Sequence, residues 1–391
     1  MRPEPLWITG IGAVTAFGEG AGALAEPLAN GRSAVRPFPG CSADAAQCDD
    51  PQAGHGARRL DRSARLFLGA AEEAWLDASL PPQLGPSERG MVIEGSSLGV
   101  LPDALAEHSK GGPARPSRLV RYLTGAGGTA FGQRHGITGP VLHLSAGSAS
   151  AAMALHHAAL LLRAGAADIA AVGGGEAPLH PDVLATFEAA RLLASPLLCR
   201  PFDEARAGTV LGEGGGAVVI ERAAHARRRG ARPRALLLGV GIGTEAAGFT
   251  APDPTGVGVA TAIRGALKNG RADAKELGWI KAHGTGTVAG DAAEYQGLRA
   301  VLHAGVERIP ITSLKPAFGH CLGASAAVEM TAAIVALESA LVPACVNTRT
   351  PDSRLAGVRV ALSAERCEGS AVLLLTEGFG GRAVAALVAR G

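Results

Sequence analysis

Residues 141–154, VLHLSAGSASAAMA, contain a short apolar strand, a turn of small residues and the start of an Ala-rich helix. Residues 309–329, IPITSLKPAFGHCLGASAAVE, follow the same order, with a longer loop between strand and helix. The two stretches predict helices over 149–164 and 323–337 that each begin beside the end of a strand. This repetition indicates a chain built from two related halves.

The rest of the chain fits the same interpretation. Short apolar segments alternate with Ala-rich helical segments, which favours an α/β protein in which helices cover sheets. The strands are expected at 6–11, 90–93, 168–172 and 217–220, and a further helix at 64–78. The basic, Pro-containing stretch 222–234 is expected to separate an N-terminal half, 1–228, from a C-terminal half, 229–391.

The composition excludes several classes of protein. In 391 residues, 37 Lys and Arg nearly balance 35 Asp and Glu, which argues against nucleic-acid binding through a general basic field. Hydrophobic residues make up 47% of the chain and charged residues 18%, so there is ample apolar surface for a core. No window approaches the roughly 20 apolar residues of a membrane span, and the first ten residues lack a signal peptide. The six cysteines form no disulfide or metal-binding pattern, so we expect a cytoplasmic protein with reduced thiols and no metal.

Residues 281–287, KAHGTGT, contain the first candidate for catalysis. His283 follows the end of an apolar strand and lies in a Gly/Thr turn, where the backbone can approach a ligand closely. Thr285 and Thr287 offer hydroxyl groups in that turn. These residues alone leave a catalytic histidine and a hydrogen-bonded turn histidine equally open.

Lys315 and His320 form a second candidate group, between a strand and the helix expected from Gly323. The free backbone N–H groups at the start of a helix favour anionic or polarised groups. A single lysine is more often a surface cation. A lysine together with two histidines would polarise a carbonyl group and bind a carboxylate.

Gly147 lies at the matching place in the first half, inside residues 144–150, LSAGSAS. Many enzymes place a nucleophile where a strand turns sharply into a helix. The start of the helix lowers the pKa of a thiol there and supplies an N–H group to an oxyanion hole. Glycine, however, has no side chain that can attack a substrate.

Together these segments resemble the β-ketoacyl-acyl-carrier-protein synthases, the ketosynthases of the thiolase fold. The matching stretches follow the family's order from residue 7 to residue 381: WITGIGAVTAFGEG, LDRSARLFLGAAEEAW, GPVLHLSAGSASAA, DIAAVGGGEA, RPFDEARAGTVLGEGGGAVVIE, TAPDP, KAHGTGTVAGDAAE, SLKPAFGHCLGASAAVE and GFGG. The resemblance implies a five-layered αβαβα fold of two pseudo-equivalent halves. It also implies substrates carried on the phosphopantetheine of acyl carrier protein, with no further cofactor.

The family's mechanism implies roles for the matching residues. In the family, a cysteine accepts an acyl chain and two histidines help to decarboxylate a malonyl thioester, whose carbanion then attacks the acyl-cysteine. By resemblance His283 and His320 are the two histidines. Lys315 is the family's lysine, with Glu294 as its expected ion-pair partner.

The resemblance also assigns the substrate-binding groups. Thr285 and Thr287 would hydrogen-bond the pantetheine arm. Phe379 would gate the pocket, and its N–H group would form an oxyanion hole with that of Gly147. The family's Gly-Phe-Gly-Gly-Thr-Asn loop departs here at Arg382, and Glu377 stands where an aromatic residue is usual, which predicts an altered gate.

The nucleophile itself is missing. The family reads approximately Thr-Ala-Cys-Ser/Ala-Ser/Gly where this chain has residues 145–149, SAGSA, with Gly147 in place of the cysteine. Ser148 lies one step further around the helix and is expected to point in a different direction. Cys321 is on the opposite strand–helix junction and Ser145 ends a strand, so neither is expected to replace the thiol.

Four explanations of the missing cysteine remain open. The chain could be the chain-length-factor-like partner of a Cys-bearing ketosynthase in type II fatty-acid, polyketide or aryl-polyene biosynthesis, which is our first hypothesis. It could be a malonyl-acyl-carrier-protein decarboxylase, since the histidines and the lysine are retained. It could be a condensing enzyme with an introduced Cys-to-Gly substitution. The last alternative is a homodimer that binds acyl chains without catalysis.

Overall fold

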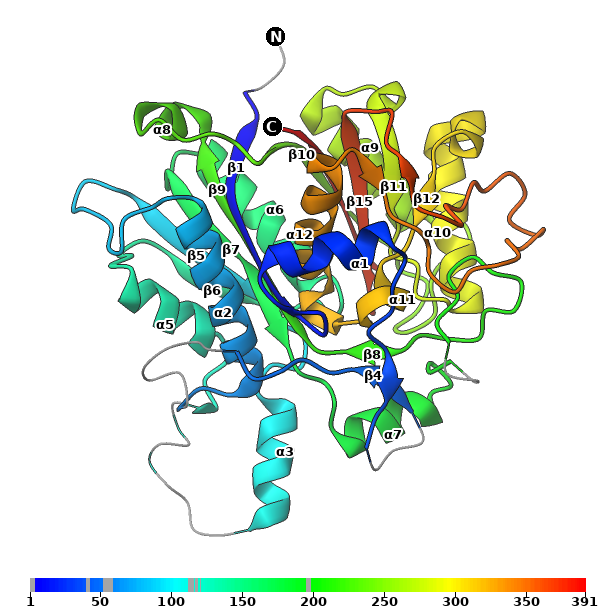
Figure 1. Cartoon of the computed structure of the whole chain (residues 1–391), viewed down its shortest axis with the longest axis horizontal. Coiled ribbons are helices and arrows are strands. Elements are labelled where there is room, and N and C mark those ends of the chain that lie inside the picture. Colours follow the sequence, from blue (N-terminus) through cyan, green and yellow to red (C-terminus); the bar gives the residue numbers. More distant parts are fainter. Residues whose placement is uncertain are drawn as a thin grey trace.

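The computed structural model describes residues 4–39, 43–51, 59–111, 116, 119, 121–194 and 198–391. Within these residues the largest element is a mixed sheet of eleven strands (Figure 1). The N-terminal half contributes β1 (Leu6–Thr15), β5 (Gly90–Gly95), β6 (Val141–Leu144), β7 (Ile169–Glu176) and β9 (Gly214–Arg222). The C-terminal half contributes β10 (Ala235–Thr244), β11 (Leu277–Lys281), β12 (Ile311–Thr312), β15 (Ala371–Gly378) and β16 (Arg382–Arg390). The short β2 (Gly18–Glu19) pairs with β1.

The two five-stranded parts of the sheet have the same topology. Their spatial orders are β6-β5-β7-β9-β1 and β12-β11-β15-β16-β10, so strands at equivalent places in the chain occupy equivalent places in space. The related halves expected from the repeat are therefore confirmed. β1 and β10 pair antiparallel between residues 6–8 and 235–237, which joins the two parts by hydrogen bonds. This continuity between the two sheets was not expected from the sequence.

Helices complete the five layers that the resemblance implied. They are α2 (Arg62–Asp77), α5 (Ala126–Arg134), α6 (Ser150–Arg163), α9 (Val257–Gly270), α10 (Val288–Leu302) and α12 (Ser325–Glu338). α6 and α12 lie between the two parts of the sheet and contact strands of both (Figure 1). α2 and α5 cover the outer face of the N-terminal part, whereas α9 covers the C-terminal part and packs against α10.

The central helix α12 is apolar on nearly every side. All residues from Ser325 to Leu337 are buried, as expected for a helix enclosed between two sheets. Outer helices pack against glycines instead. A Cβ atom at Gly10 or Gly12 of β1 would lie 2.0 Å from the carbonyl oxygens of Ala74 and Ala70 in α2. These glycines therefore allow the helix backbone to lie directly on the sheet.

Most of the expected elements are present, although several boundaries differ. The expected strand at 309–313 is reduced to β12, and the expected separator at 222–234 includes a short helix, α8 (Ala223–Arg228). The division at residue 228 itself stays a prediction. The sequence interpretation did not identify β10, β15, β16, α9 or α10.

The remaining described elements are short, apart from α3 and α7. They are η1 (Ala21–Leu24), α1 (Ala25–Ala29), β3 (Arg36–Pro37), β4 (Asp44–Ala46), α3 (Leu101–Lys110), α7 (Pro181–Ala189), β8 (Leu211–Gly212), η3 (Ala274–Glu276), η4 (His303–Glu307), α11 (Lys315–Phe318), η5 (Leu322–Ala324), β13 (Leu341–Val342) and β14 (Glu365–Arg366). None of the helices in the described residues combines the length and the hydropathy that a membrane crossing requires.

Candidate active site

The two histidines named from the sequence meet at the centre of the molecule. His283 follows β11, and His320 lies in the segment between α11 and α12. Their ring centroids are 5.6 Å apart, with an angle of 81° between the ring planes. Both side chains are buried. A strand end and an interhelical segment of the C-terminal half thus bring two imidazoles within reach of one substrate group.

The turn at Gly147 comes from the N-terminal half. Gly147 has a φ of 60°, in the left-handed region that glycine adopts at little cost. Ser150, the first residue of α6, holds the turn: its Oγ accepts from the Ala146 N–H at 2.9 Å and donates to the Gly147 carbonyl at 2.6 Å. A Cβ atom at position 147 would lie 3.4 Å from the Phe379 nitrogen, an ordinary contact distance.

Ser148 points toward His320, a contact that the sequence interpretation did not predict. Its Oγ lies 3.0 Å from His320 Nε2, and His320 Nδ1 lies 2.8 Å from the Oγ of Ser325. The sequence places Ser148 beside Gly147 but cannot show which way its hydroxyl group turns. Ser148 in the turn before α6 and Ser325 at the start of α12 thus contact the two nitrogens of one imidazole.

Glu294 acts on the backbone of the histidine turn. Its carboxylate accepts from the N–H groups of His283 at 2.5 Å and Gly284 at 2.8 Å. The ion pair expected between Glu294 and Lys315 is wrong. Lys315 instead pairs with Glu329 at 2.7 Å, because Glu329 enters the site from the middle of α12 while Glu294 is occupied by the backbone.

Glu329 serves two buried lysines. Its second oxygen pairs with Lys281, and Lys315 Nζ also donates to the His283 carbonyl oxygen. The sequence interpretation gave Glu329 and Lys281 no role. The signal for Glu329 was a carboxylate in the middle of a helix whose neighbouring residues are mostly apolar, since such a charge requires a buried partner.

The electrostatics of the site keep both imidazoles neutral. Burial lowers the pKa of His283 well below its usual value, and the positive charges of Lys315 and Lys281 act in the same direction. Burial also lowers the pKa of His320 well below its usual value, again with Lys315 and Lys281 as contributors. The two rings can therefore accept protons or hydrogen bonds at neutral pH.

Thr285 and Thr287 continue the histidine turn, and the Phe379 backbone lies near Gly147. The hydroxyl groups of Thr285 and Thr287 are 3.0 Å apart, and Thr287 also caps α10 by accepting from the Gly290 N–H at 3.2 Å. Phe379 lies between β15 and β16 and is partly exposed. Their roles in binding pantetheine and gating the pocket stay predictions.

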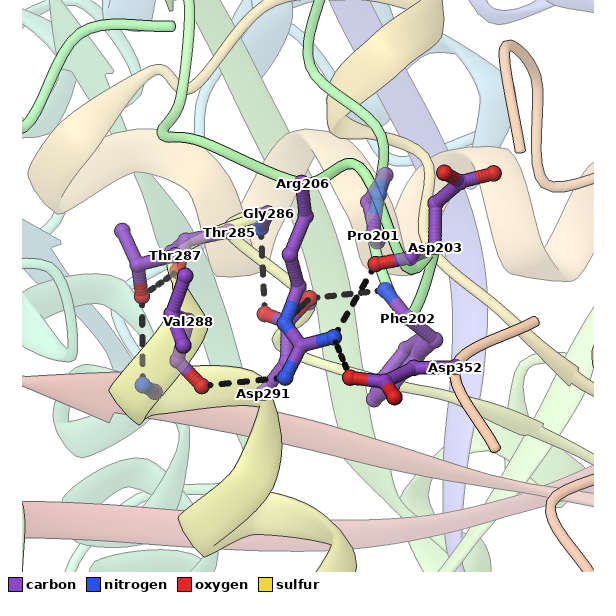
Figure 2. Close-up of polar contacts among 12 residues, drawn as sticks. Pro201, Phe202, Asp203, Arg206, Thr285, Gly286, Thr287, Val288, Asp291 and Asp352 are labelled. Carbon is purple, nitrogen blue, oxygen red and sulfur yellow. Dashed lines mark hydrogen bonds and ion pairs between the residues drawn. The ribbon is translucent and has the colours of Figure 1, made fainter. Parts of the chain in front are cut away.

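A second polar cluster contacts the part of the histidine turn that contains Gly286 (Figure 2). Asp291 accepts from the N–H groups of Phe202 at 2.7 Å and Gly286 at 3.0 Å. The Arg206 guanidinium lies between the carboxylates of Asp291 and Asp352 and donates to the carbonyl oxygen of Val288. Burial raises the pKa of Asp291 to about 7. This cluster ties the turn to the loop that contains Phe202, and the sequence interpretation assigned it no function.

Comparison with known proteins agrees with this geometry. The family described as "Beta-ketoacyl synthase, N-terminal domain" matches residues 3–226, and "Beta-ketoacyl synthase, C-terminal domain" matches residues 234–349. The oxytetracycline polyketide putative beta-ketoacyl synthase 1 of Streptomyces rimosus is 32% identical, with 96% of this chain and 94% of the relative covered. The tetracenomycin polyketide synthase ketoacyl synthase alpha subunit of Streptomyces glaucescens is also 32% identical, with 98% and 96% covered.

Solved structures extend the likeness to the whole fold. The structure titled "The ishigamide ketosynthase/chain length factor" aligns with a TM-score of 0.92 at 26% identity, and 100% of each chain is covered. A chain of the structure titled "AntDE:AntF (apo): type II PKS acyl-carrier protein in complex with its ketosynthase bound to the hexaketide" aligns with a TM-score of 0.90 at 27% identity, again over 100% of each chain. Both domain families match in their expected order, and the structure holds the paired histidines together. The chain therefore belongs to the β-ketoacyl synthase family.

Proposed function

We propose that this chain is the chain-length-factor-like subunit of a heterodimer with a Cys-bearing ketosynthase homologue, in type II fatty-acid, polyketide or aryl-polyene biosynthesis. Its substrates are carried by acyl carrier protein. The observation that carries the proposal is Gly147, which occupies the nucleophile position without a side chain. Condensation through an acyl-thioester on this chain is therefore not expected.

The described cysteines offer no substitute for the missing nucleophilic thiol. Burial raises the pKa of Cys345 to about 11 and that of Cys321 well above its usual value. Burial likewise raises the pKa values of Cys48, Cys199 and Cys367. A buried thiol that keeps its proton is a poor nucleophile at neutral pH. In this proposal the thiol for condensation therefore belongs to the partner.

The edge of the sheet supports such a partnership. β6 is the last strand of the N-terminal part and pairs with β5 on one side. Its Val141 and Leu142 are 39% and 40% exposed, and the nearby Leu160 of α6 is 50% exposed. His143 of β6 has a buried Nδ1 without a hydrogen-bond partner among the described residues. An apolar sheet edge of this kind favours pairing with a second chain.

The similar structures favour a ketosynthase as that second chain. One is titled as a ketosynthase with a chain length factor, and the other contains an acyl carrier protein in complex with its ketosynthase. By analogy, β6 would pair with the corresponding strand of the Cys-bearing homologue. This chain would then help to shape the space in which the partner's acyl chain grows.

Co-expression with a Cys-bearing ketosynthase from the same source tests this proposal. We expect a stable one-to-one complex in size-exclusion chromatography. Leu142→Arg should dissociate it, whereas Leu76→Arg, at an apolar position of α2 that is 74% exposed, should leave it intact. A homodimer that ignores the Cys-bearing chain, or a complex that survives Leu142→Arg unchanged, would contradict the proposed partnership.

Decarboxylation is the second candidate, and the intact histidine centre favours it. His283, His320 and Lys315 are the groups that a pure scaffold does not need, yet they lie together around buried ion pairs. The chain alone would then release carbon dioxide from malonyl-acyl carrier protein, and His283→Ala should abolish the release. Activity of the isolated chain would establish this function, and its absence in both the isolated chain and the complex would exclude it.

A further inference from the structure

Ser148, His320 and Ser325 form a continuous chain of polar contacts in the site. The Ser148 hydroxyl contacts Nε2 of the imidazole at 3.0 Å, and the Ser325 hydroxyl contacts Nδ1 at 2.8 Å. A nucleophile in contact with a base, whose other side is oriented by a third group, is the recurring arrangement of nucleophilic catalysis. The side chains come from α12, its preceding segment and the turn before α6.

The state of His320 suits the role of a base. Its ring is buried beside two lysines, so it is neutral and carries one lone pair. When the proton is on Nδ1, this nitrogen donates to Ser325 Oγ, and Nε2 is free to accept the proton of Ser148. Ser148 itself is only partly buried.

Gly147 leaves room beside this hydroxyl. A side chain there would begin 3.4 Å from the Phe379 nitrogen and 3.7 Å from the Phe379 carbonyl oxygen. Because residue 147 is glycine, no side chain lies between this turn and the Phe379 backbone at that place. The Phe379 N–H is the atom nearest to that position and is a candidate donor to a developing oxyanion.

We propose that Ser148 is an acyl-accepting nucleophile that removes acyl groups from phosphopantetheine thioesters and releases them by hydrolysis. Ser148 Oγ attacks the thioester carbonyl carbon while its proton passes to His320 Nε2. The carbon–sulfur bond breaks, and the departing thiolate takes that proton. Water then attacks the serine ester and gives a proton to Nε2, which returns it to Oγ as the ester bond breaks. The products are a carboxylic acid and a thiol.

This activity goes beyond the partner role proposed above. Its substrate class depends on membership in the β-ketoacyl synthase family and not on the heterodimer. An acyl chain that enters this pocket has no cysteine at position 147 to receive it. Release as the free acid would clear such chains from the subunit, with no reactant other than water.

The test uses the full chain without a partner and a hexanoyl N-acetylcysteamine thioester as the probe. We expect free thiol to appear, and peptide mapping after rapid acid quench to find the hexanoyl group on Ser148. Ser148→Ala should lower the rate by roughly 100-fold or more, as for loss of a nucleophile and its base contact. Ser145→Ala, at the exposed end of the preceding strand, should retain the rate. Thermal unfolding verifies that both variants fold.

Equal rates in the parent and folded Ser148→Ala would overturn the assignment, as would an adduct on any other residue. Ser148→Cys provides an independent measurement, since it should accumulate a stable thioester at position 148; a folded variant that stays unlabelled also counts against the proposal. Ser148→Ala should leave assembly with the Cys-bearing chain intact. Loss of hydrolysis with retained assembly, or the reverse, therefore separates this proposal from the partner role.

Ser325 is a positioning residue in this scheme. Ser325→Ala should lower kcat several-fold with little change in KM, because the substrate does not contact it. The acid limb of the pH–rate profile should also move, because the Ser325 hydroxyl is hydrogen-bonded to the imidazole of His320, whose protonation sets that limb. Ser325→Thr, which retains the hydroxyl group, should restore both. An unchanged profile in a folded Ser325→Ala protein would remove Ser325 from the scheme and, with it, the oriented base that the mechanism requires.

Discussion

The carboxylate of Glu329 lies between two buried lysines, with Oε1 2.7 Å from Lys315 Nζ and Oε2 paired with Lys281. One side chain of α12 thus balances charges from the end of β11 and the start of α11. Lys315 also donates to the carbonyl oxygen of His283. The charge balance at Glu329 is therefore connected to the position of the histidine turn.

Removing the Glu329 charge should destabilise the protein strongly. Glu329→Gln leaves two buried ammonium groups without a counter-ion, and breaking a buried ion pair costs about 3–5 kcal/mol. Urea unfolding of the parent and the variant measures the difference. The matched control is Glu338→Gln at the more exposed end of the same helix, which should cost about 1 kcal/mol or less. Equal losses in the free energy of unfolding for the two variants would show that Glu329 does not stabilise the two buried lysines.

Gly147→Cys should create a reactive thiol. The start of α6 favours a thiolate through its free N–H groups, and the imidazole of His320 contacts the neighbouring Ser148. The left-handed backbone at this position costs a residue with a Cβ atom about 1–3 kcal/mol. Iodoacetamide should label the variant faster than the buried native cysteines, and a long-chain acyl carrier protein should acylate it.

Gly147→Ala is the control for the new thiol, since it carries the backbone strain without sulfur. Peptide mapping is needed because Cys41 lies outside the described residues. A folded Gly147→Cys protein that is neither alkylated faster than its native thiols nor acylated would mean that position 147 is not the nucleophile position. The argument for a missing nucleophile would then fail.

The buried carboxyl group of Glu94 should make stability fall as the pH rises. Burial raises its pKa to about 8, although it accepts a hydrogen bond from the Gly128 N–H at 2.7 Å. Between about pH 4.5 and 8 the folded chain holds a proton that the unfolded chain has lost. The stabilisation that this proton gives the folded state is fully present below about pH 4.5. It decreases by up to ~1.4 kcal/mol per pH unit as the pH rises and is lost above about pH 8.

Glu94→Gln isolates that contribution, because the amide has no proton to lose. The free energy of unfolding of the parent, relative to Glu94→Gln, should decline between pH 5 and pH 8. The exposed Glu204→Gln variant should run parallel to the parent over the same range. Parallel curves for the parent and Glu94→Gln would rule out a proton on Glu94 in the folded protein.

Asp291→Asn should weaken the support behind the histidine turn. Asp291 accepts from two backbone N–H groups, whereas asparagine has one oxygen and would present an amide N–H₂ to the other donor. A buried donor left without a partner costs about 1–3 kcal/mol. Thermal or urea unfolding measures this loss, with the exposed Asp182→Asn as control. A loss no larger than that of the control would show that the cluster in Figure 2 does not stabilise the turn.

Much of the fold was available from the sequence because hydrophobic periodicity is a local property. The repeated strand–turn–helix stretches at 141–154 and 309–329 predicted two related halves, and the identical strand orders confirm them. β15 and β16 were missed. Their residues are buried on both faces, so they lack the alternation that identifies a half-exposed strand.

The sequence by itself determined which chemical groups the centre contains: Gly147 without a thiol, two histidines and a lysine. These follow from residue identity at positions next to strand ends. Only the tertiary structure decided which partners they have. Lys315 pairs with Glu329 and not with Glu294, and Ser148 turns toward His320. Ser148 and His320 are 172 residues apart in the chain, and Lys315 and Glu329 lie in different helices, so both pairings depend on how α6, α11 and α12 pack between the sheets.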